Sequence, residues 1–408
     1  MKTSVRHCNL LLRQRFCTKS APKVKTRMGT HMSAWQIFQY GGNKELTPTT
    51  TARVPNILKP TDLLVEIHAA SVNPIDTMMR GGYGKAMINL LRQGLWNQAG
   101  GTEFPLILGR DFSGVVMETG KGVTRYKPGD EVWGAIATQR QGTHAQYCIV
   151  GQSEISHKPK SLSHIEAASL PYVAVTTWTA LCLVGELTQK STQNKRVLIH
   201  GGAGGLGTFA IQLMKTWGAE VTTTCSTDAV SLVQSLGADV VIDYKTQDVQ
   251  SELQRISGFD VILDPLGGKI PTFSVDLLKG WRNSKYVSLV TPILSSTDKF
   301  GIPLGLFTSA TNFGTNVIKG FINGRSYRWA LFTPNGNALG QIAKLVDNGK
   351  QLRVRGRSLQ LGRPAGVGGS PEGGLCPLWE VLQELWSWSL DLRPGSLFSL
   401  LISLRSNL

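Results

Sequence analysis

A run of glycines between a short apolar strand and a helix limits most strongly how this chain can fold. The predicted strand ends at His200 and is followed by Gly201-Gly202-Ala203-Gly204-Gly205-Leu206-Gly207, where a helix begins. Gly202, Gly204 and Gly207 have the GxGxxG spacing, which allows a tight turn, close approach of a pyrophosphate and close packing of helix on strand. The N-terminus of such a helix attracts phosphate. We therefore predict a dinucleotide site, with a glycine-rich turn without ligand as the alternative.

Short apolar strands alternate with helices on both sides of this motif. The predicted strands are Arg196–Ile199, Ala219–Thr224, Val240–Ile242, Phe259–Leu263 and Tyr286–Val290. This alternation predicts a parallel sheet with right-handed crossovers, an α/β architecture. A further helix is expected over residues 163–187, because Ser163 and Glu166 have the spacing of a capping box.

The end of the second strand indicates which nicotinamide cofactor is bound. An NAD site usually has an acidic residue there to hold the ribose 2′-hydroxyl, but this chain has Ser226, and Asp228 follows two residues later. Ser226 can donate to a 2′-phosphate, and Tyr244 and Lys245 after the next strand supply a ring and a cation. We therefore expect NADPH rather than NADH. The alternative for Ser226 is simple helix capping.

Asp264 closes another strand and begins the sequence Asp264-Pro265-Leu266-Gly267-Gly268. Carboxyl ends of strands line the cofactor crevice in doubly wound sheets. We expect this loop on the nicotinamide side, with an ordinary β–α turn as the alternative.

Residues 33–160 differ from this pattern, because they are rich in strand and turn signals and show weak helical periodicity. Leu63–Ala69, Gly114–Glu118 and the Pro128-Gly129 turn before Val132 are examples. The sequence therefore predicts a β-rich domain followed by a dinucleotide-binding domain.

The net charge of +16 suggests nucleic acid or anionic lipid until its position is considered. Eight basic residues lie within residues 1–27, and the first acidic residue is Glu45. An arginine-rich, acid-free N-terminus is typical of a mitochondrial transit peptide, which we place at residues 1–30; the alternative is a basic arm that binds nucleic acid or membrane. Nothing nearby resembles a base-reading module, so we expect no DNA partner.

The six cysteines are widely spaced, which disfavours a disulfide framework.

Several segments support a family resemblance. Ala70-Ser71-Val72-Asn73-Pro74-Ile75-Asp76, the segment Phe104–Val116 and the glycine motif resemble the medium-chain dehydrogenase/reductase superfamily, in its zinc-free quinone oxidoreductase branch. Segments Ser156–Leu162, Leu170–Ala174 and Ser326–Ala330 are similar to the mitochondrial, reticulon-interacting members of that branch. The resemblance implies a GroES-like β-rich catalytic domain (31–162), a Rossmann doubly wound parallel-sheet domain that binds NADPH (163–332) and a return helix (333–350).

The resemblance also implies site residues. Zinc-dependent relatives carry a Gly-His-Glu motif with a zinc ligand, and this chain has Gly109-Arg110-Asp111, so we expect no metal. Asn73 matches the family's substrate-cleft asparagine, which can donate to a substrate oxygen; the alternative is a turn residue before Pro74. Asp76 and Tyr83 lie on the same segment, and Tyr83 can cap the pocket or relay a proton. Asp111 is expected to have a structural role. The cofactor residues implied by the family are Ala203, Gly205, Leu206, Ser226, Tyr244, Leu289, Ala330 and Phe332.

The family pattern ends near Lys350. Residues 351–408 form a divergent tail rich in Leu and Trp, which we expect to be poorly folded. The family's final strands would complete the first domain, so their loss predicts an unstable or inactive form; each unburied Leu or Phe forfeits roughly 1.5–3 kcal/mol. The alternative is a genuine partner-binding or membrane-surface helix around residues 375–386.

These observations predict a mitochondrial enzyme, in the matrix or associated with a membrane, that uses NADPH to reduce a small quinone or related enone, with a link to ubiquinone metabolism. Two alternatives stay open. One is a 2-enoyl thioester reductase, and the other is a non-catalytic protein that keeps the fold and binds a reticulon-type membrane protein or RNA. A homodimer is compatible with either.

Overall fold

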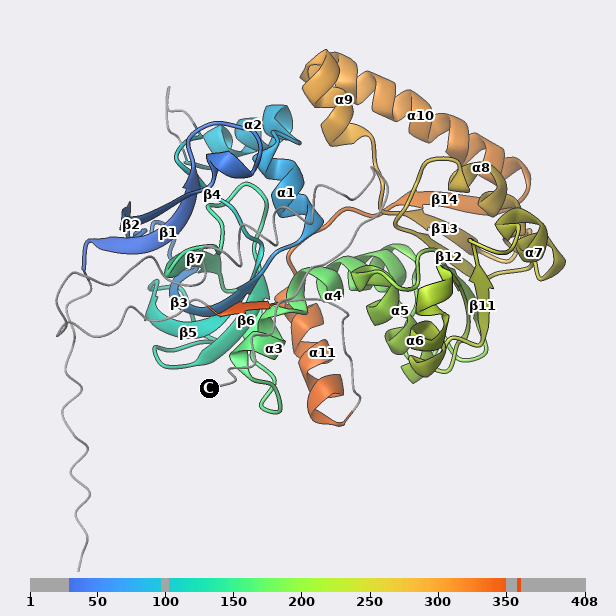
Figure 1. Cartoon of the computed structure of the whole chain (residues 1–408), viewed down its shortest axis with the longest axis horizontal. Coiled ribbons are helices and arrows are strands. Elements are labelled where there is room, and N and C mark those ends of the chain that lie inside the picture. The colour runs from blue at the N-terminus through green and yellow to red at the C-terminus, as the bar shows by residue number, and fades with distance from the viewer. Residues whose placement is uncertain (1–28, 97–102, 350–357, 361–408) are drawn as a thin grey trace, which may run out of the picture.

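The chain folds into two domains that lie side by side (Figure 1). The structure is a computed structural model that describes residues 29–96, 103–349 and 358–360. Almost all of the predicted transit peptide, and the 351–408 tail except for 358–360, lie outside the described residues. Among the described helices, none is long and apolar enough to cross a bilayer.

The first domain contains two antiparallel sheets, one in the order β2-β1-β4 and the other in the order β15-β3-β5-β6-β8, with β7 also paired to β3. The strands are β1 (His31–Ile37), β2 (Thr47–Arg53), β3 (Asp62–Ser71), β4 (Leu106–Ile107), β5 (Asp111–Thr119), β6 (Glu131–Ala135), β7 (Tyr147–Gly151), β8 (Ile155–His157) and β15 (Ser358–Gln360). Helices α1 (Pro74–Arg80) and α2 (Lys85–Trp96) lie in the same domain. The weak periodicity of the sequence did not predict these two helices.

Strand β3 is paired along its outer edge by two different strands. β7 pairs with Asp62–Glu66, and β15 pairs with Ala69–Ser71. The described part of the tail therefore adds three residues to the edge that β7 leaves open. The pairing of β15 with β3 partly compensates for the predicted loss of the family's final strands.

The second domain has six parallel strands in the order β11-β10-β9-β12-β13-β14, which confirms the predicted sheet. The strands are β9 (Arg196–Ile199), β10 (Glu220–Cys225), β11 (Val240–Asp243), β12 (Val261–Asp264), β13 (Ser284–Ser288) and β14 (Arg325–Trp329). The helices that follow them are α5 (Gly205–Thr216), α6 (Val230–Ser235), α7 (Val249–Arg255), α8 (Ile270–Ser274), α9 (Ile293–Phe300) and α10 (Ile302–Ile322). Neighbouring residues of β9 enter different cores, since Val197 and Ile199 pack in one and Leu198 in the other. A strand buried on both faces is a continuous apolar run, as Val197, Leu198 and Ile199 of β9 are.

The segment between the domains is not one helix over 163–187. The capping box is present, because Ser163 Oγ accepts from the backbone N–H of Glu166 and the Glu166 carboxylate accepts from Ser163. The helix is interrupted after α3 (His164–Ala168), and Pro171 starts α4 (Pro171–Trp178), which continues into a π-helical turn, Thr179–Val184. Proline lacks an N–H group and is favoured in the first helical turn. As a result, α3 packs on β3 and β5, while α4 packs on α5.

Helix α11 (Gly336–Asp347) follows the second domain and packs against β8 and α4. It occupies the place of the predicted return helix. The core of the second domain takes in Leu339 and Ile342 of α11 and also Trp133 of β6. The two domains therefore share buried apolar contacts.

Candidate active site

The glycine loop has the close backbone approaches that its spacing predicted. A Cβ atom on Gly202 would lie 2.0 Å from Thr223 Oγ1, and one on Gly207 would lie 2.3 Å from the carbonyl oxygen of Gly201. Gly201 has φ +67°, a left-handed conformation that favours glycine. Helix α5 begins directly after Gly204. Its first-turn N–H groups have no intrahelical acceptors and point to the loop, so this cradle fits a pyrophosphate.

The residues that follow β10 and β11 lie together at the carboxyl edge of the sheet. These strands pair with Cys225 opposite Asp243, and the N–H of Tyr244 donates to Cys225 O at 3.0 Å. Ser226 follows Cys225 directly, and Lys245 Nζ lies 5.7 Å from the centre of the Tyr244 ring, which is 52% exposed. A hydroxyl, an open aromatic face and a cation are therefore adjacent, beside the second strand of the motif.

Asp243 directly precedes Tyr244 and Lys245, and its charge is engaged locally. Its carboxylate accepts from Thr227 Oγ1 at 2.6 Å and from the N–H of Lys245 at 2.9 Å. These hydrogen bonds hold the pKa of Asp243 below its ordinary value. The Asp243 carboxylate therefore stabilises the turn after β11.

The buried side chain of Asp264 holds the loop after β12 in place through hydrogen bonds. The side chain is fully buried and accepts from the Tyr286 hydroxyl and from the N–H groups of Leu266 and Gly267 at 2.9 and 2.8 Å. A carboxylate held in this way has no surface left for a ligand. We predicted that Asp264 binds the cofactor; in this structure its carboxylate instead positions Leu266 and Gly267.

The remaining residues that the sequence predicted to bind the cofactor lie near the junction of the two domains. Leu289 N–H donates to Asp264 O at 2.9 Å, and Ala330 N–H donates to Ser288 O at 2.9 Å. Leu289 directly follows the carboxyl end of β13, and Ala330 follows that of the edge strand β14. Phe332 packs its ring 4.5 Å from that of Tyr172 on α4. Ala203 of the glycine loop is partly exposed. These positions agree with the crevice that the fold predicts for a dinucleotide.

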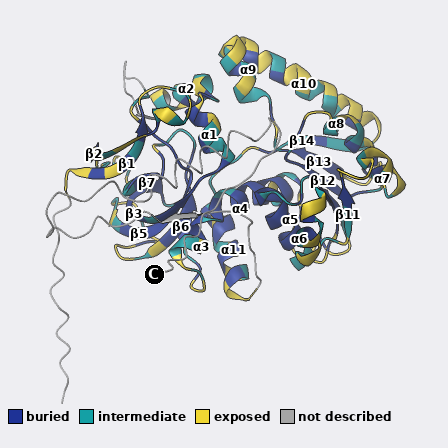
Figure 2. Ribbon diagram, in the orientation of Figure 1, coloured by how far each residue is buried: buried dark blue, intermediate teal, exposed yellow. Residues whose placement is uncertain are grey.

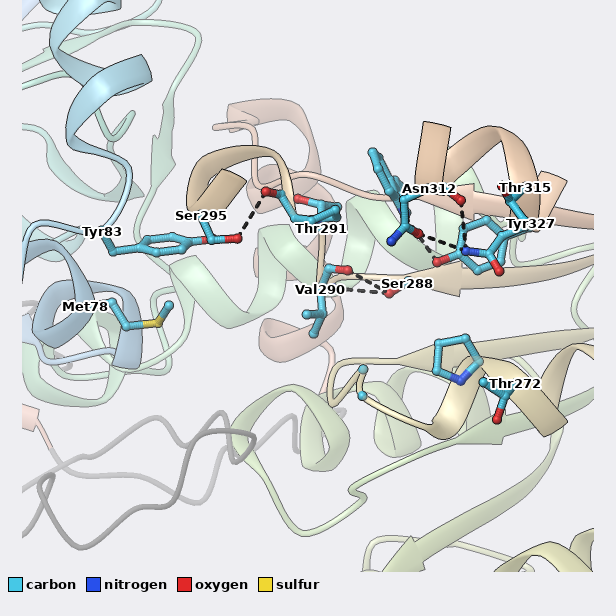
Figure 3. A pocket seen from close by; sticks show the side chains of 16 residues that line it. Met78, Tyr83, Thr272, Ser288, Val290, Thr291, Ser295, Asn312, Thr315 and Tyr327 are labelled. Atoms are coloured by element: carbon cyan, nitrogen blue, oxygen red, sulfur yellow. Dashed lines mark hydrogen bonds between the residues drawn. The ribbon is translucent and has the colours of Figure 1, made fainter. Parts of the chain in front are cut away.

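A cavity of about 640 Å³ lies between the domains, beside the loop that Asp264 fixes (Figure 3). Met78 and Tyr83 form its first-domain side, while Gly267 and Gly268 lie on the opposite side. The other residues lining it are Pro271, Thr272, Ser288, Val290, Thr291, Pro292, Ser295, Asn312, Thr315, Asn316, Tyr327 and Trp329. Of the three predicted catalytic residues, Tyr83 lines this cavity. Burial and the negative charge of Asp298 raise the pKa of Tyr83, so its phenol keeps its proton at neutral pH.

Asn73 and Asp76 instead belong to a buried cluster behind the cavity. Asn73 Nδ2 donates to Asp111 Oδ2 at 2.9 Å and to Ser71 Oγ at 3.1 Å. Asp76 accepts from the N–H groups of Asn73 and Gly109 at 2.7 and 3.1 Å and is fully buried. A carboxylate without exposed surface cannot touch a substrate, so Asp76 is a positioning residue here. In this conformation the amide hydrogens of Asn73 also point to protein oxygens.

Asp111 is the centre of this cluster and joins the two domains. It accepts from Ser71 Oγ at 2.5 Å and from the N–H of Tyr172 at 2.5 Å. Burial raises its pKa to about 7. The structural, hydrogen-bonded role expected for Asp111 is confirmed, and Tyr172 in turn packs on Phe332 of the cofactor crevice.

Comparisons with known proteins agree with this geometry. The model of the alcohol dehydrogenase GroES-like domain matches residues 59–211, and that of the zinc-binding dehydrogenase matches residues 205–297. The mitochondrial NAD(P)H oxidoreductase RTN4IP1 of Homo sapiens is 50% identical over 321 residues, which are 79% of this chain and 81% of the relative. The chain belongs to the medium-chain dehydrogenase/reductase superfamily. Reticulon-4-interacting protein 1 of Caenorhabditis elegans is 36% identical over 346 residues, covering 85% of this chain and 90% of the relative.

Among solved structures, the quinone oxidoreductase of Coxiella burnetii matches with a TM-score of 0.66 and 27% identity, over 92% of this chain and all of that one. These relatives make this member of the superfamily a mitochondrial oxidoreductase that uses a nicotinamide cofactor.

The name of the second family model includes zinc, but the residues present do not fit a zinc ion. Arg110, in the place of the family's histidine ligand, is fully buried, and its Nε lies 3.8 Å from Asp76 Oδ1. A guanidinium cannot be a zinc ligand and would repel the ion. The described residues contain no group of three or more His, Cys, Asp or Glu side chains that could hold a metal.

Sequence reasoning missed the polar residues at the far end of the cavity, Asn312, Thr315 and Asn316 of α10. Their signal was weak, because no motif marks them. The one signal in the sequence that could have marked this segment is the long stretch from Val290 to Gly324, which has only three charged residues.

Proposed function

We propose that this protein reduces a quinone or a related enone in mitochondria, by hydride transfer from NADPH and without zinc. The observation that carries this proposal is the position of the cavity. It lies between Tyr83 of the first domain and Gly267-Gly268 at the carboxyl end of the central strand β12, next to the cofactor crevice. An acceptor in the cavity would therefore have a proton donor on one side and the cofactor on the other.

NADPH would be held by residues whose positions fit its parts. The glycine loop and the first turn of α5 would bind the pyrophosphate, and Ser226, Tyr244 and Lys245 would bind the 2′-phosphate and adenine end. When bound, NADPH supplies the hydride. The adjacency of Lys245 to the Tyr244 ring supports a phosphate there, since NADH has only a hydroxyl at the same position.

The acceptor takes one hydride and one proton. A conjugated carbonyl spreads the developing negative charge onto its oxygen, so hydrogen-bond donors can replace a metal ion. Tyr83 is placed to supply the proton, and its raised pKa keeps it protonated. The name of the Coxiella burnetii relative, a quinone oxidoreductase, supports this acceptor class, and a link to ubiquinone metabolism follows as part of the same proposal.

The test compares cofactor affinity and turnover. The dissociation constants for NADPH and NADH are measured by fluorescence titration for the unchanged chain and for Ser226→Asp, and NADPH oxidation is followed with soluble benzoquinones and enones. We expect a preference for NADPH of at least tenfold, reversed in Ser226→Asp, and turnover with at least one acceptor. Equal affinity for both cofactors would reject NADPH specificity, and tight binding without turnover would favour a non-catalytic role.

A reticulon-type membrane protein is a second proposed partner, supported by the name of the Caenorhabditis elegans relative. Binding of a purified reticulon cytosolic segment to the intact chain, measured by calorimetry, tests it. Absence of binding at micromolar concentrations would reject it and leave the enzymatic proposal unaffected.

A further inference from the structure

Helix α10 carries its large apolar side chains on the side that faces away from the domain. Phe307 is 66% exposed and Phe321 is 74% exposed, and Leu304, Ile318 and Ile322 are also exposed. At 100° per residue these five positions fall on one side of the helix. The buried residues of α10 are instead small, Gly305, Ser309 and Gly320. Figure 2 shows exposed residues along the outer side of the α9–α10 hairpin.

Polar residues of the same helix border the cavity. Asn312, Thr315 and Asn316 line the cavity, while Phe313 and Val317 pack on the sheet core. A helix on a water-exposed surface normally shows the opposite arrangement, with a polar outer face. The outer face of α10 therefore has the character of a buried surface, and an apolar patch of this kind marks an interaction site.

The charges around the patch are almost all positive. Between Gly280 and Ala330 the one acidic residue is Asp298, whose carboxylate accepts from backbone N–H groups of Gly84 and Ala86. Arg282, Lys299 and Lys319 are exposed, and none of the three takes part in the ion pairs found among the described residues. Trp281, 76% exposed, lies against Gly324 at the end of α10.

We propose that the outer face of α10, with Trp281, docks on the surface of an anionic lipid bilayer. Exposed Phe, Leu and Ile with an adjacent Trp would enter the interface between headgroups and acyl chains, while the three cations would contact phosphate headgroups. A second copy of this chain fits less well, because a face-to-face pair would bring cations together without acidic partners. The charge of the patch is complementary to anionic lipid and not to itself.

Docking would have a consequence for the cavity, and this step rests on the proposed function. The helix that meets the lipid also forms the cavity wall, so the cavity would lie about one helix diameter, roughly 10 Å, from the membrane surface. A lipophilic quinone could then reach the cavity with a short path through water.

The experiment measures binding of the full chain to vesicles, without cofactor or acceptor. Flotation is compared for vesicles of pure phosphatidylcholine and for vesicles with one fifth phosphatidylglycerol. The variant Phe307→Ser/Phe321→Ser removes the two most exposed rings of α10, and Leu58→Ser, an exposed apolar residue of the first domain, is the matched control. Melting temperature and NADPH affinity verify that each variant is folded.

We expect the unchanged chain and Leu58→Ser to bind the anionic vesicles, the double variant to bind at least tenfold more weakly, and pure phosphatidylcholine to bind more weakly than the anionic mixture. Equal binding by the double variant would overturn the proposal, because another part of the chain would then be responsible. A dimer that dissociates in the double variant, detected by sedimentation equilibrium, would overturn it in favour of self-association. Turnover of soluble quinones tests the proposed function separately.

Discussion

The carboxylate of Asp298, on α9 of the second domain, accepts a hydrogen bond of 2.5 Å from the backbone N–H of Gly84 in the first domain. Its second oxygen accepts from the N–H of Ala86 at 3.0 Å, so a side chain of one domain caps helix α2 of the other. Leu294 of α9 packs in the same place, against the core that contains Ile88. These contacts join the two domains beside Tyr83.

Replacing Asp298 by Ala should loosen this junction. Loss of a helix cap costs about 1 kcal/mol of unfolding free energy, and the KM for the acceptor should rise more than the dissociation constant of the cofactor. Urea unfolding and steady-state kinetics check both. Asp276→Ala, which removes an exposed partner of Arg325, should cost less than about 0.5 kcal/mol; an equal loss in both variants would contradict the special role of Asp298.

The glycine loop should not accept a methyl group. Gly202→Ala would place Cβ 2.0 Å from Thr223 Oγ1, so we expect at least a tenfold loss of cofactor affinity in a fluorescence titration. In contrast, Gly314→Ala on α10 meets no atom within 4 Å and should stabilise the chain by about 0.5–1 kcal/mol. Unchanged affinity in Gly202→Ala would show that the loop does not approach the pyrophosphate.

Lys245→Ala should weaken NADPH binding about tenfold or more and leave NADH binding unchanged, because only NADPH carries the 2′-phosphate that the cation would contact. Lys190→Ala, another exposed lysine of the same domain, is the control. An equal loss for both cofactors would place Lys245 elsewhere in the site.

Tyr83→Phe removes one hydroxyl from the cavity wall. If this hydroxyl supplies the proton, kcat should fall about 100-fold with little change in KM. The change should also remove the alkaline limb of the pH–rate profile, since the raised pKa of Tyr83 would set that limb. Tyr147→Phe in the first domain should have no such effect, and an unchanged kcat in Tyr83→Phe would exclude the proton role.

Asp111 should make the protein less stable as the pH rises. Its pKa is raised from 3.8 to about 7 in the folded state, so the folded chain binds one more proton than the unfolded chain between these values. The unfolding free energy should therefore fall by on the order of 1 kcal/mol per pH unit from about pH 4 to pH 7. In Asp111→Asn this contribution should be absent, as urea unfolding at pH 5 and pH 8 would show, while Glu118→Gln on the exposed end of the same strand should keep it.

The sequence predicted the second domain well for a physical reason. Strands such as β12 are buried on both faces, so Val261, Ile262 and Leu263 form a continuous apolar run. The glycines fix the turn between β9 and α5. Ser226 and Tyr244 could be brought together from the sequence alone, because parallel neighbouring strands end at the same edge.

Other parts of the site could not be predicted in this way. Asn73 looked like a substrate donor, but the pairing of β3 with β5 brings Ser71 and Asp111 to its amide. The contact between Asp298 and Gly84 joins residues 214 positions apart, which no local pattern indicates. Helix α10 was missed because most of its large apolar residues are exposed, so the spacing of apolar residues in the sequence does not mark a core-facing side.

The α9–α10 hairpin lies within the crossover between β13 and β14. Lengthening a connection costs little, since the entropy of closing a loop grows only with the logarithm of its length, about 0.6 kcal/mol for each doubling. A crossover is therefore a place where an enzyme can acquire a new surface without rebuilding its sheet. Replacing the hairpin by a shorter crossover helix that keeps the core contacts of Phe313 and Val317 should remove the exposed apolar side chains while leaving the glycine loop and the strand order intact.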